Sequence, residues 1–156
     1  MDDAQPEKCA ISISWFEIRL NTAIVELNDS YDKFRISEAL MTTYKLVWDD
    51  FCSWYLEMVK PGFEQPIDAK TLGATIGFFE TILKLMHPFT PFISEEIYQL
   101  LNERKEKDSI VVAVWPKAGG SDPGLLRSFE QTAEVVSGIR NIRKQKNIPN
   151  KVAIEL

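Results

Sequence analysis

The sequence predicts an all-α protein, an antiparallel bundle of about five helices. Apolar residues recur at steps of three and four along several long stretches, as on one face of an α-helix. Clusters of proline, glycine and aspartate separate these stretches, as expected of turns between helices. The chain has 156 residues, of which 45% are hydrophobic, so one domain can bury an ordinary core.

The longest apolar pattern lies between Ile36 and Pro61, where we predict the central helix of the bundle. Ser37 is the expected N-cap, and Pro61 with Gly62 is expected to end the helix. Two apolar stripes lie side by side along it, so it should touch neighbours on more than one side. The first stripe contains Leu40, Tyr44, Val47, Phe51, Trp54 and Met58, and the second contains Met41, Trp48, Cys52, Tyr55 and Val59.

Two further helices are predicted on either side of this one, after residues 1–10, which we expect to be loop or disordered. The first covers residues 11–32, and the other runs from Ala69 to His87 with Asp68 as its N-cap. The expected inward residues are Phe16, Leu20, Ile24, Leu27 and Tyr31 in the first helix, and Leu72, Ile76, Phe79, Leu83 and Met86 in the other.

The last part of the chain should contain two more helices and some extended structure. Thr90 is the expected N-cap of a helix from Pro91 to Glu103. The β-branched segment 110–116 is predicted to be extended, and whether it pairs as a strand is left open. Ser121 or Asp122 should cap a helix from Pro123 to Lys146, and residues 147–156 should begin a truncated junction region with a terminal strand at 152–156. The inward residues of this last helix are Leu126, Phe129, Ala133, Val136, Ile139 or Arg140, and Ile142.

Catalytic and metal-binding patterns are missing from the sequence. Its one histidine, His87, precedes a proline at a helix end, where we expect a structural role. Glu95 and Glu96 are adjacent, so they point about 100° apart and cannot face each other as acid and base. We therefore predict no catalytic residue, no metal and no cofactor in this chain. No apolar run suggests a membrane span, and the cysteine usage favours the cytoplasm.

Two features suggest RNA binding. Trp15 heads a polar stripe with Arg19, and it either packs against a neighbouring segment or forms a stacking platform for an unstacked base. The net charge of −5 argues against general nucleic-acid coating, but residues 135–156 carry five cations and one acid. This basic end is either a solvated helix terminus or an RNA-binding surface. Its RNA-binding candidates are Arg140, Arg143, Lys144 and Lys146.

Four segments in this order resemble the anticodon-binding helical domain of class I aminoacyl-tRNA synthetases, and valyl-tRNA synthetases in particular. They are VWDDFCSWYLEMVKP at 47–61, LMHPFTPFISEEIYQ at 85–99, VAVWP at 112–116 and IRNIRKQKNIP at 139–149. WFEIRLN at 15–21 is similar to a helix early in the same domain. The first helix usual in that domain, of the type NKLWNAARF, does not precede Trp15, so we expect residues 11–146 to lack it.

The resemblance implies a non-catalytic piece of a longer enzyme that joins valine to its tRNA using ATP. It implies valine-accepting tRNA as the partner, together with the catalytic and C-terminal domains of the same chain. We expect a monomer that binds neither DNA nor membranes. The alternatives are the same domain of an isoleucyl or leucyl enzyme, or a helical module that binds a protein partner.

Overall fold

The computed structural model describes residues 6–105, 107–149 and 152, and in that part of the chain all regular structure is helical. The prediction of an all-α fold is confirmed. The chain forms two compact units, one up to Ser121 and one from Asp122. The helices are α1 (Glu7–Asp32), α2 (Ile36–Lys45), the π-helix η1 (Leu46–Tyr55), α3 (Leu56–Val59), α4 (Ala69–Met86), α5 (Pro91–Leu101), the 3₁₀-helix η2 (Ile110–Val112) and α6 (Pro123–Gln145).

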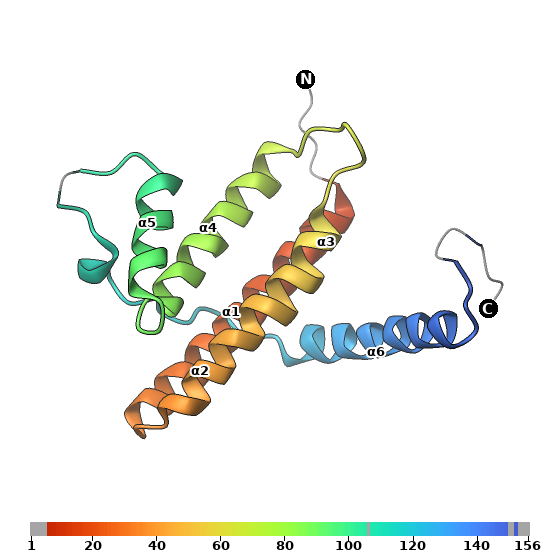
Figure 1. Ribbon diagram of the computed structural model, residues 1–156, viewed down its shortest axis with the longest axis horizontal. Helices are drawn as coiled ribbons and strands as arrows, with labels where there is room; N and C mark the ends of the chain where they lie inside the picture. Colours follow the sequence, from red (N-terminus) through yellow and green to blue (C-terminus); the bar gives the residue numbers. More distant parts are fainter. Residues whose placement is uncertain (1–5, 106, 150–151, 153–156) are drawn as a thin grey trace. The chain divides into compact units, whose positions relative to one another are not determined.

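The first unit is built on a hairpin of two long helical rods (Figure 1). One rod is α1, and the other is the continuous run of α2, η1 and α3. Helix α4 packs on α1, and α5 packs on α4. Helix α1 begins at Glu7, four residues before the predicted start, so the expectation of a loop over residues 7–10 is wrong. Cys9 lies in this added turn and is buried.

The central helix differs from the prediction because its middle ten residues are π-helical. In a π-helix each hydrogen bond spans five residues instead of four, so the buried face shifts by one residue. The Ser53 hydroxyl follows the same spacing and donates to the Trp48 carbonyl at 2.8 Å. The buried residues are Ala39, Thr43, Leu46, Phe51, Tyr55 and Val59, with one step of five between Leu46 and Phe51.

This shift leaves half of the predicted apolar arc in solvent. Trp48 is 59% exposed and Tyr44 is 55% exposed, and Leu40, Met41 and Cys52 are also exposed. The predicted contacts on more than one side are present, since Tyr55 lies against Phe16 of α1 and Phe78 of α4, but neither stripe is buried along its whole length. The rod also begins and ends at other residues than predicted. It begins at Ile36 without a Ser37 cap, and it ends at Val59.

The core of the bundle is a cluster of aromatic rings around Phe16, which is completely buried. The Phe16 ring centroid lies 4.8 Å from that of Tyr55, 5.1 Å from that of Phe78 and 5.3 Å from that of Phe51. The Tyr55 hydroxyl pairs with Thr75 at 2.8 Å, and Thr75 donates to a carbonyl of its own helix. These contacts join α1, η1 and α4 at one point.

Helix α4 faces neighbours on two sides, which a single inward stripe did not predict. Thr71, Ile82 and Leu85 are buried, whereas the predicted inward residue Leu72 is 44% exposed. The predicted start of the helix is confirmed, because Asp68 accepts a hydrogen bond from the Thr71 N–H at 2.9 Å. The start of α5 at Pro91 after Thr90 is also confirmed, although the Thr90 side chain bonds Met86 instead of capping.

A second apolar cluster joins α4, α5 and η2 around Leu83, Tyr98 and Ile110. The guanidinium of Arg104 lies 3.3 Å from the centre of the Tyr98 ring and bonds Glu80 at 3.1 Å. The prediction of an extended segment at 110–116 fails for residues 110–112, which form a 3₁₀ turn, whereas Ala113 is extended and residues 113–116 do not pair as a strand. The turn forms because Glu95 accepts the N–H of Ile110 at 3.0 Å, in place of a strand partner.

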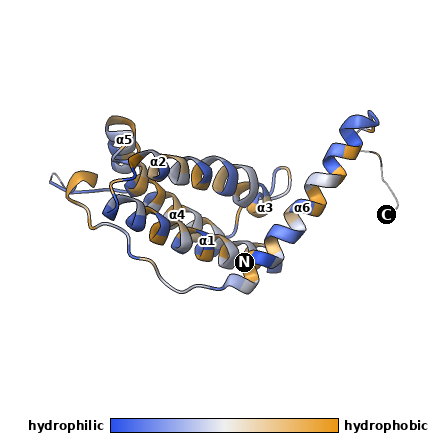
Figure 2. Ribbon diagram, turned by 90° about the horizontal axis from the view of Figure 1, so that it is seen from below, coloured by the Kyte–Doolittle hydropathy of each residue, from blue (hydrophilic) through white to orange (hydrophobic). Residues whose placement is uncertain are grey.

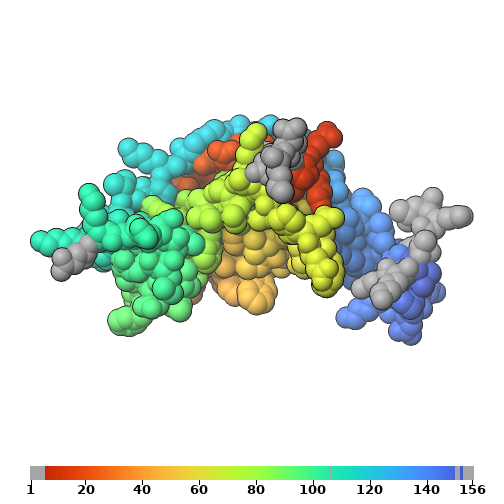
Figure 3. All heavy atoms as spheres, turned by 90° about the horizontal axis from the view of Figure 1, so that it is seen from above, coloured from red at the N-terminus to blue at the C-terminus, as the bar shows by residue number. Residues whose placement is uncertain are grey.

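The segment after η2 is held along α1 by two asparagines. Trp115 donates to Asn28 at 2.9 Å, and Asn21 bonds both the Gly119 N–H at 3.0 Å and the Gly120 carbonyl at 3.1 Å. A Cβ on Gly119 would lie 3.1 Å from the Asn21 side chain, so this approach favours glycine. Figure 3 shows the segment in cyan beside the red and orange spheres of α1.

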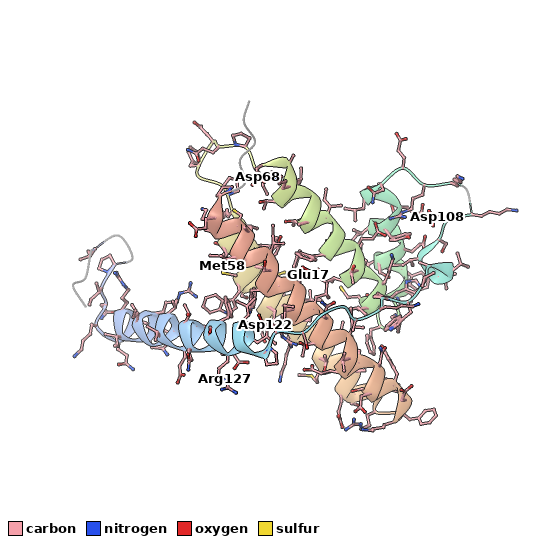
Figure 4. All side chains as sticks on the ribbon, turned by 180° about the vertical axis from the view of Figure 1, so that it is seen from behind. Glu17, Met58, Asp68, Asp108, Asp122 and Arg127 are labelled. Atoms are coloured by element: carbon pink, nitrogen blue, oxygen red, sulfur yellow. The ribbon has the colours of Figure 1, made fainter. Side chains whose placement is uncertain are left out.

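The second unit consists of α6 and the turn that follows it. Asp122 accepts a hydrogen bond from the Leu125 N–H at 3.0 Å, so of the two predicted caps it is Asp122 that acts (Figure 4). Apolar and polar residues alternate along α6 in Figure 2, and no α6 residue is buried. The helix ends near the predicted Lys146. The predicted strand at 152–156 lies outside the described residues, apart from Val152.

We expect Phe16→Ala to lower the free energy of unfolding by about 3–5 kcal/mol, because it removes a ring that joins α1 to η1 and α4. Urea unfolding followed by circular dichroism measures this loss. Phe92→Ala is the matched control, since that ring is 91% exposed and its removal should change stability by less than about 0.5 kcal/mol. Equal effects of the two substitutions would contradict the proposed core.

Candidate nucleic-acid interface

The C-terminal half of α6 is the most cationic part of the described chain. Arg140, Arg143, Lys144 and Lys146 fall within seven residues, and no acidic residue occurs between 135 and 149. At about 100° per residue, Arg143 and Lys144 lie about 60° and 40° to either side of Arg140, so the three share one face. Lys146 points elsewhere. This face can bind an anionic surface such as an RNA backbone.

Arg143 also holds the turn that follows α6. Its two terminal nitrogens donate to the carbonyls of Pro149 and Val152, each at 2.8 Å. The turn is closed by hydrogen bonds from Asn147 to Lys144 and from Ile148 to Arg143, with Asn147 in the left-handed region at φ 50°. Arg143 therefore orders the end of the cationic segment in addition to carrying charge. Lys144 and Lys146 are exposed.

Trp15 lies inside the bundle. Its side chain is 3% exposed, and its ring centroid is 5.9 Å from that of Phe16. Of the two interpretations of this tryptophan, packing against a neighbouring element is therefore the one that the structure supports. The interpretation as a stacking platform fails because a base could reach the indole only if the helices separated.

Arg19 is used in the contact between α1 and η1. Its Nε donates to the Asp50 carboxylate at 2.8 Å, and another nitrogen lies 3.8 Å from Glu26. Burial raises the pKa of the Asp50 carboxyl, and Arg19 opposes that rise. Arg19 thus compensates a carboxylate at a helix interface, so we do not include it among the proposed RNA contacts.

No catalytic or metal-binding arrangement appears among the described residues. They contain no cluster of three histidine, cysteine, aspartate or glutamate side chains that could hold a metal. His87 pairs with Ser94 at 2.8 Å, and Ser94 is completely buried and donates to the Thr90 carbonyl. Because the Ser94 proton is used there, His87 donates to Ser94, which agrees with a structural role for this histidine. No described helix is long and apolar enough to cross a membrane.

An apolar groove of about 340 Å³ runs between the central rod and the end of α4. No carboxylate, amine, guanidinium or imidazole group lines it, so it offers no acid–base chemistry. Its lining residues are Leu40, Thr43, Tyr44, Val47, Trp48, Met86, Phe89 and Thr90.

Phe34, at the turn between α1 and α2, is a feature that sequence patterns did not reveal. Its backbone is left-handed at φ 57°, and its side chain is 88% exposed. A left-handed conformation costs an L-residue about 1–2 kcal/mol. The sequence signal that could have revealed this feature is the absence of glycine and asparagine from the short turn between the first two predicted helices. Asp29 binds both neighbouring cations, Lys33 and Arg35, and chiefly the Lys33 hydrogen bond lowers the pKa of Asp29.

Comparison with known proteins gives a consistent result. Residues 14–156 match the family described as the anticodon-binding domain of tRNA ligase. The chain is 55% identical over 153 residues to a valine–tRNA ligase of Parabacteroides distasonis, and 48% identical over 151 residues to that of Christiangramia forsetii. A valine–tRNA ligase of Carboxydothermus hydrogenoformans is 33% identical over 147 residues. These alignments cover 98%, 97% and 92% of this chain, but only 18%, 17% and 16% of the relatives.

We expect the carboxyls of Asp50 and Asp29 to titrate on opposite sides of 3.8, the reference pKa for both. Burial raises the pKa of Asp50, and the hydrogen bond from Lys33 lowers that of Asp29. Carboxyl carbon chemical shifts measured by NMR against pH give both values. An Asp50 pKa at or below 3.8 would contradict its burial.

The raised pKa of Asp50 also fixes the sign of its effect on stability. In this pH range the folded chain binds more protons at Asp50 than the unfolded chain does. Its contribution to stability is therefore fully present below the unfolded pKa and is lost as the pH rises through the folded pKa. The free energy of unfolding of the wild type, minus that of Asp50→Asn, should fall as the pH rises from about 3.5 to 6.

Proposed function

Because this chain belongs to the family of anticodon-binding domains of tRNA ligases, we propose that it binds the anticodon stem-loop of a valine-accepting tRNA. The observation that carries the proposal is the acid-free cationic face of α6, formed by Arg140, Arg143 and Lys144. Phosphate binding is driven by such cations, because they release counterions from the RNA. Lys146 adds charge on an adjacent face.

The proposal extends to the longer protein to which the relatives point. We propose that this domain acts within a cytoplasmic valyl-tRNA synthetase that attaches valine to tRNA using ATP. Amino-acid activation would occur in another part of that protein, and this domain would hold the distant end of the tRNA. We further propose that it works as a monomer.

Replacing three cations in and directly after α6 together tests the RNA contact. We expect Arg140→Ala, Lys144→Ala and Lys146→Ala combined to weaken binding of valine tRNA. The slope of log affinity against log salt should also decrease by about 0.7–0.9 for each phosphate that the variant no longer binds. Arg143 is kept because it holds the turn after the helix. Filter binding or fluorescence anisotropy over a salt series measures both quantities.

Arg127→Ala is the matched control, since it removes a cation from the same helix near Glu130 and Glu134 (Figure 4). It should leave affinity and salt slope nearly unchanged. Competition by isoleucine and leucine tRNAs measures specificity, and we expect valine tRNA to compete best. Unchanged binding by the triple variant would overturn the assignment to α6, and lack of binding by the wild type at low salt would overturn the function.

A further inference from the structure

The turn between α1 and α2 keeps an aromatic residue where the fold gains nothing from it. Phe34 occupies the position after the helix end where left-handed backbone is required, and glycine or asparagine is favoured there. The turn is closed by backbone hydrogen bonds from Arg35 to Ser30 at 2.8 Å and from Phe34 to Tyr31 at 3.0 Å. Neither bond involves the phenylalanine ring, which is 88% exposed.

A turn of the same kind follows α6, but a different residue type occupies its left-handed position. That turn has the same pair of backbone hydrogen bonds, from Ile148 to Arg143 and from Asn147 to Lys144. The left-handed residue there is Asn147, with φ 50°. Phe34 therefore combines backbone strain with an exposed apolar ring, and neither is needed to form the turn. A feature with these two costs and no packing contribution suggests a binding role.

Cations flank Phe34 on both sides in sequence. Lys33 and Arg35 both pair with Asp29, and Arg35 also pairs with Glu38 at 3.0 Å. The partner that we consider for the ring is the RNA proposed above for this domain, because aromatic side chains stack on unpaired bases. The other strongly exposed phenylalanines, Phe63 and Phe92, lack a cation next to them in sequence. Phe63 lies between Gly62 and Glu64, and Phe92 lies between Pro91 and Ile93.

We propose that the exposed ring of Phe34, at the α1–α2 turn, stacks on an unpaired base of the RNA that this domain binds. The inference rests on the proposed function and adds a base contact to the phosphate contacts of α6. Unpaired bases in RNA loops expose their faces to aromatic side chains, whereas paired bases do not. The turn forms one end of the hairpin in Figure 1, so its ring is accessible.

Stacking predicts a different signature from phosphate binding. In the 156-residue chain, Phe34→Ala should weaken binding of the anticodon stem-loop of valine tRNA by about 5- to 150-fold, the range for loss of one stacked base. The salt slope should stay unchanged, because no cation is removed. Affinity for a fully paired RNA duplex of equal length should also stay unchanged. Phe34→Trp should retain stem-loop binding.

Phe34→Asn separates function from structure, since it relieves the strained backbone while it removes the ring. Its melting temperature should rise by about 2–4 °C while stem-loop affinity falls as for Phe34→Ala. Phe63→Ala is the control for removal of an exposed ring and should bind like the wild type. Wild-type affinity of Phe34→Ala, or equal losses in Phe34→Ala and Phe63→Ala, would overturn the inference. Either result leaves the α6 proposal standing if the triple variant has lost binding.

Discussion

The packing of rings around Phe16 constrains much of the first unit. Its neighbours come from η1 and α4, so the two rods and the third helix must meet at one level along their lengths. The step of five between Leu46 and Phe51 in the π-helical segment keeps both of these residues buried, and Tyr55 follows Phe51 on the same face. Its hydroxyl then reaches Thr75, which satisfies the polar atom that Tyr55 brings into the cluster.

The cations of this chain divide between the bundle and α6. Arg19 and Arg104 are committed to the bundle, the first to Asp50 and the second to Glu80 and the Tyr98 ring. The run in α6 has no carboxylate near it in sequence, so it forms a local excess of positive charge. An acidic protein with net charge −5 can thus present a local basic surface to RNA.

Local chemistry made some elements predictable from sequence, and tertiary contacts made others unpredictable. Asp68, Pro91 and Asp122 marked helix starts correctly because caps act within a few residues. The five-residue step after Leu46 was missed, because a 3.6-residue period assumes an uninterrupted α-helix. The burial of Trp15 and the 3₁₀ turn at Ile110 depend on partners distant in sequence. The run of cations in α6 can be read directly from the sequence, whereas the exposure of Phe34 can be seen only in the structure.

The π-helical segment also bears on how this domain tolerates changes in length. Removing one residue between Leu46 and Phe51 would turn the single step of five in the buried face into the step of four of an ordinary α-helix. The buried residues before and after the deletion would then stay on one face. A deletion in α2 itself would instead rotate the residues on its two sides by about 100° relative to each other. Homologous genes should therefore lose a codon within the π-helical segment more readily than elsewhere along this helix.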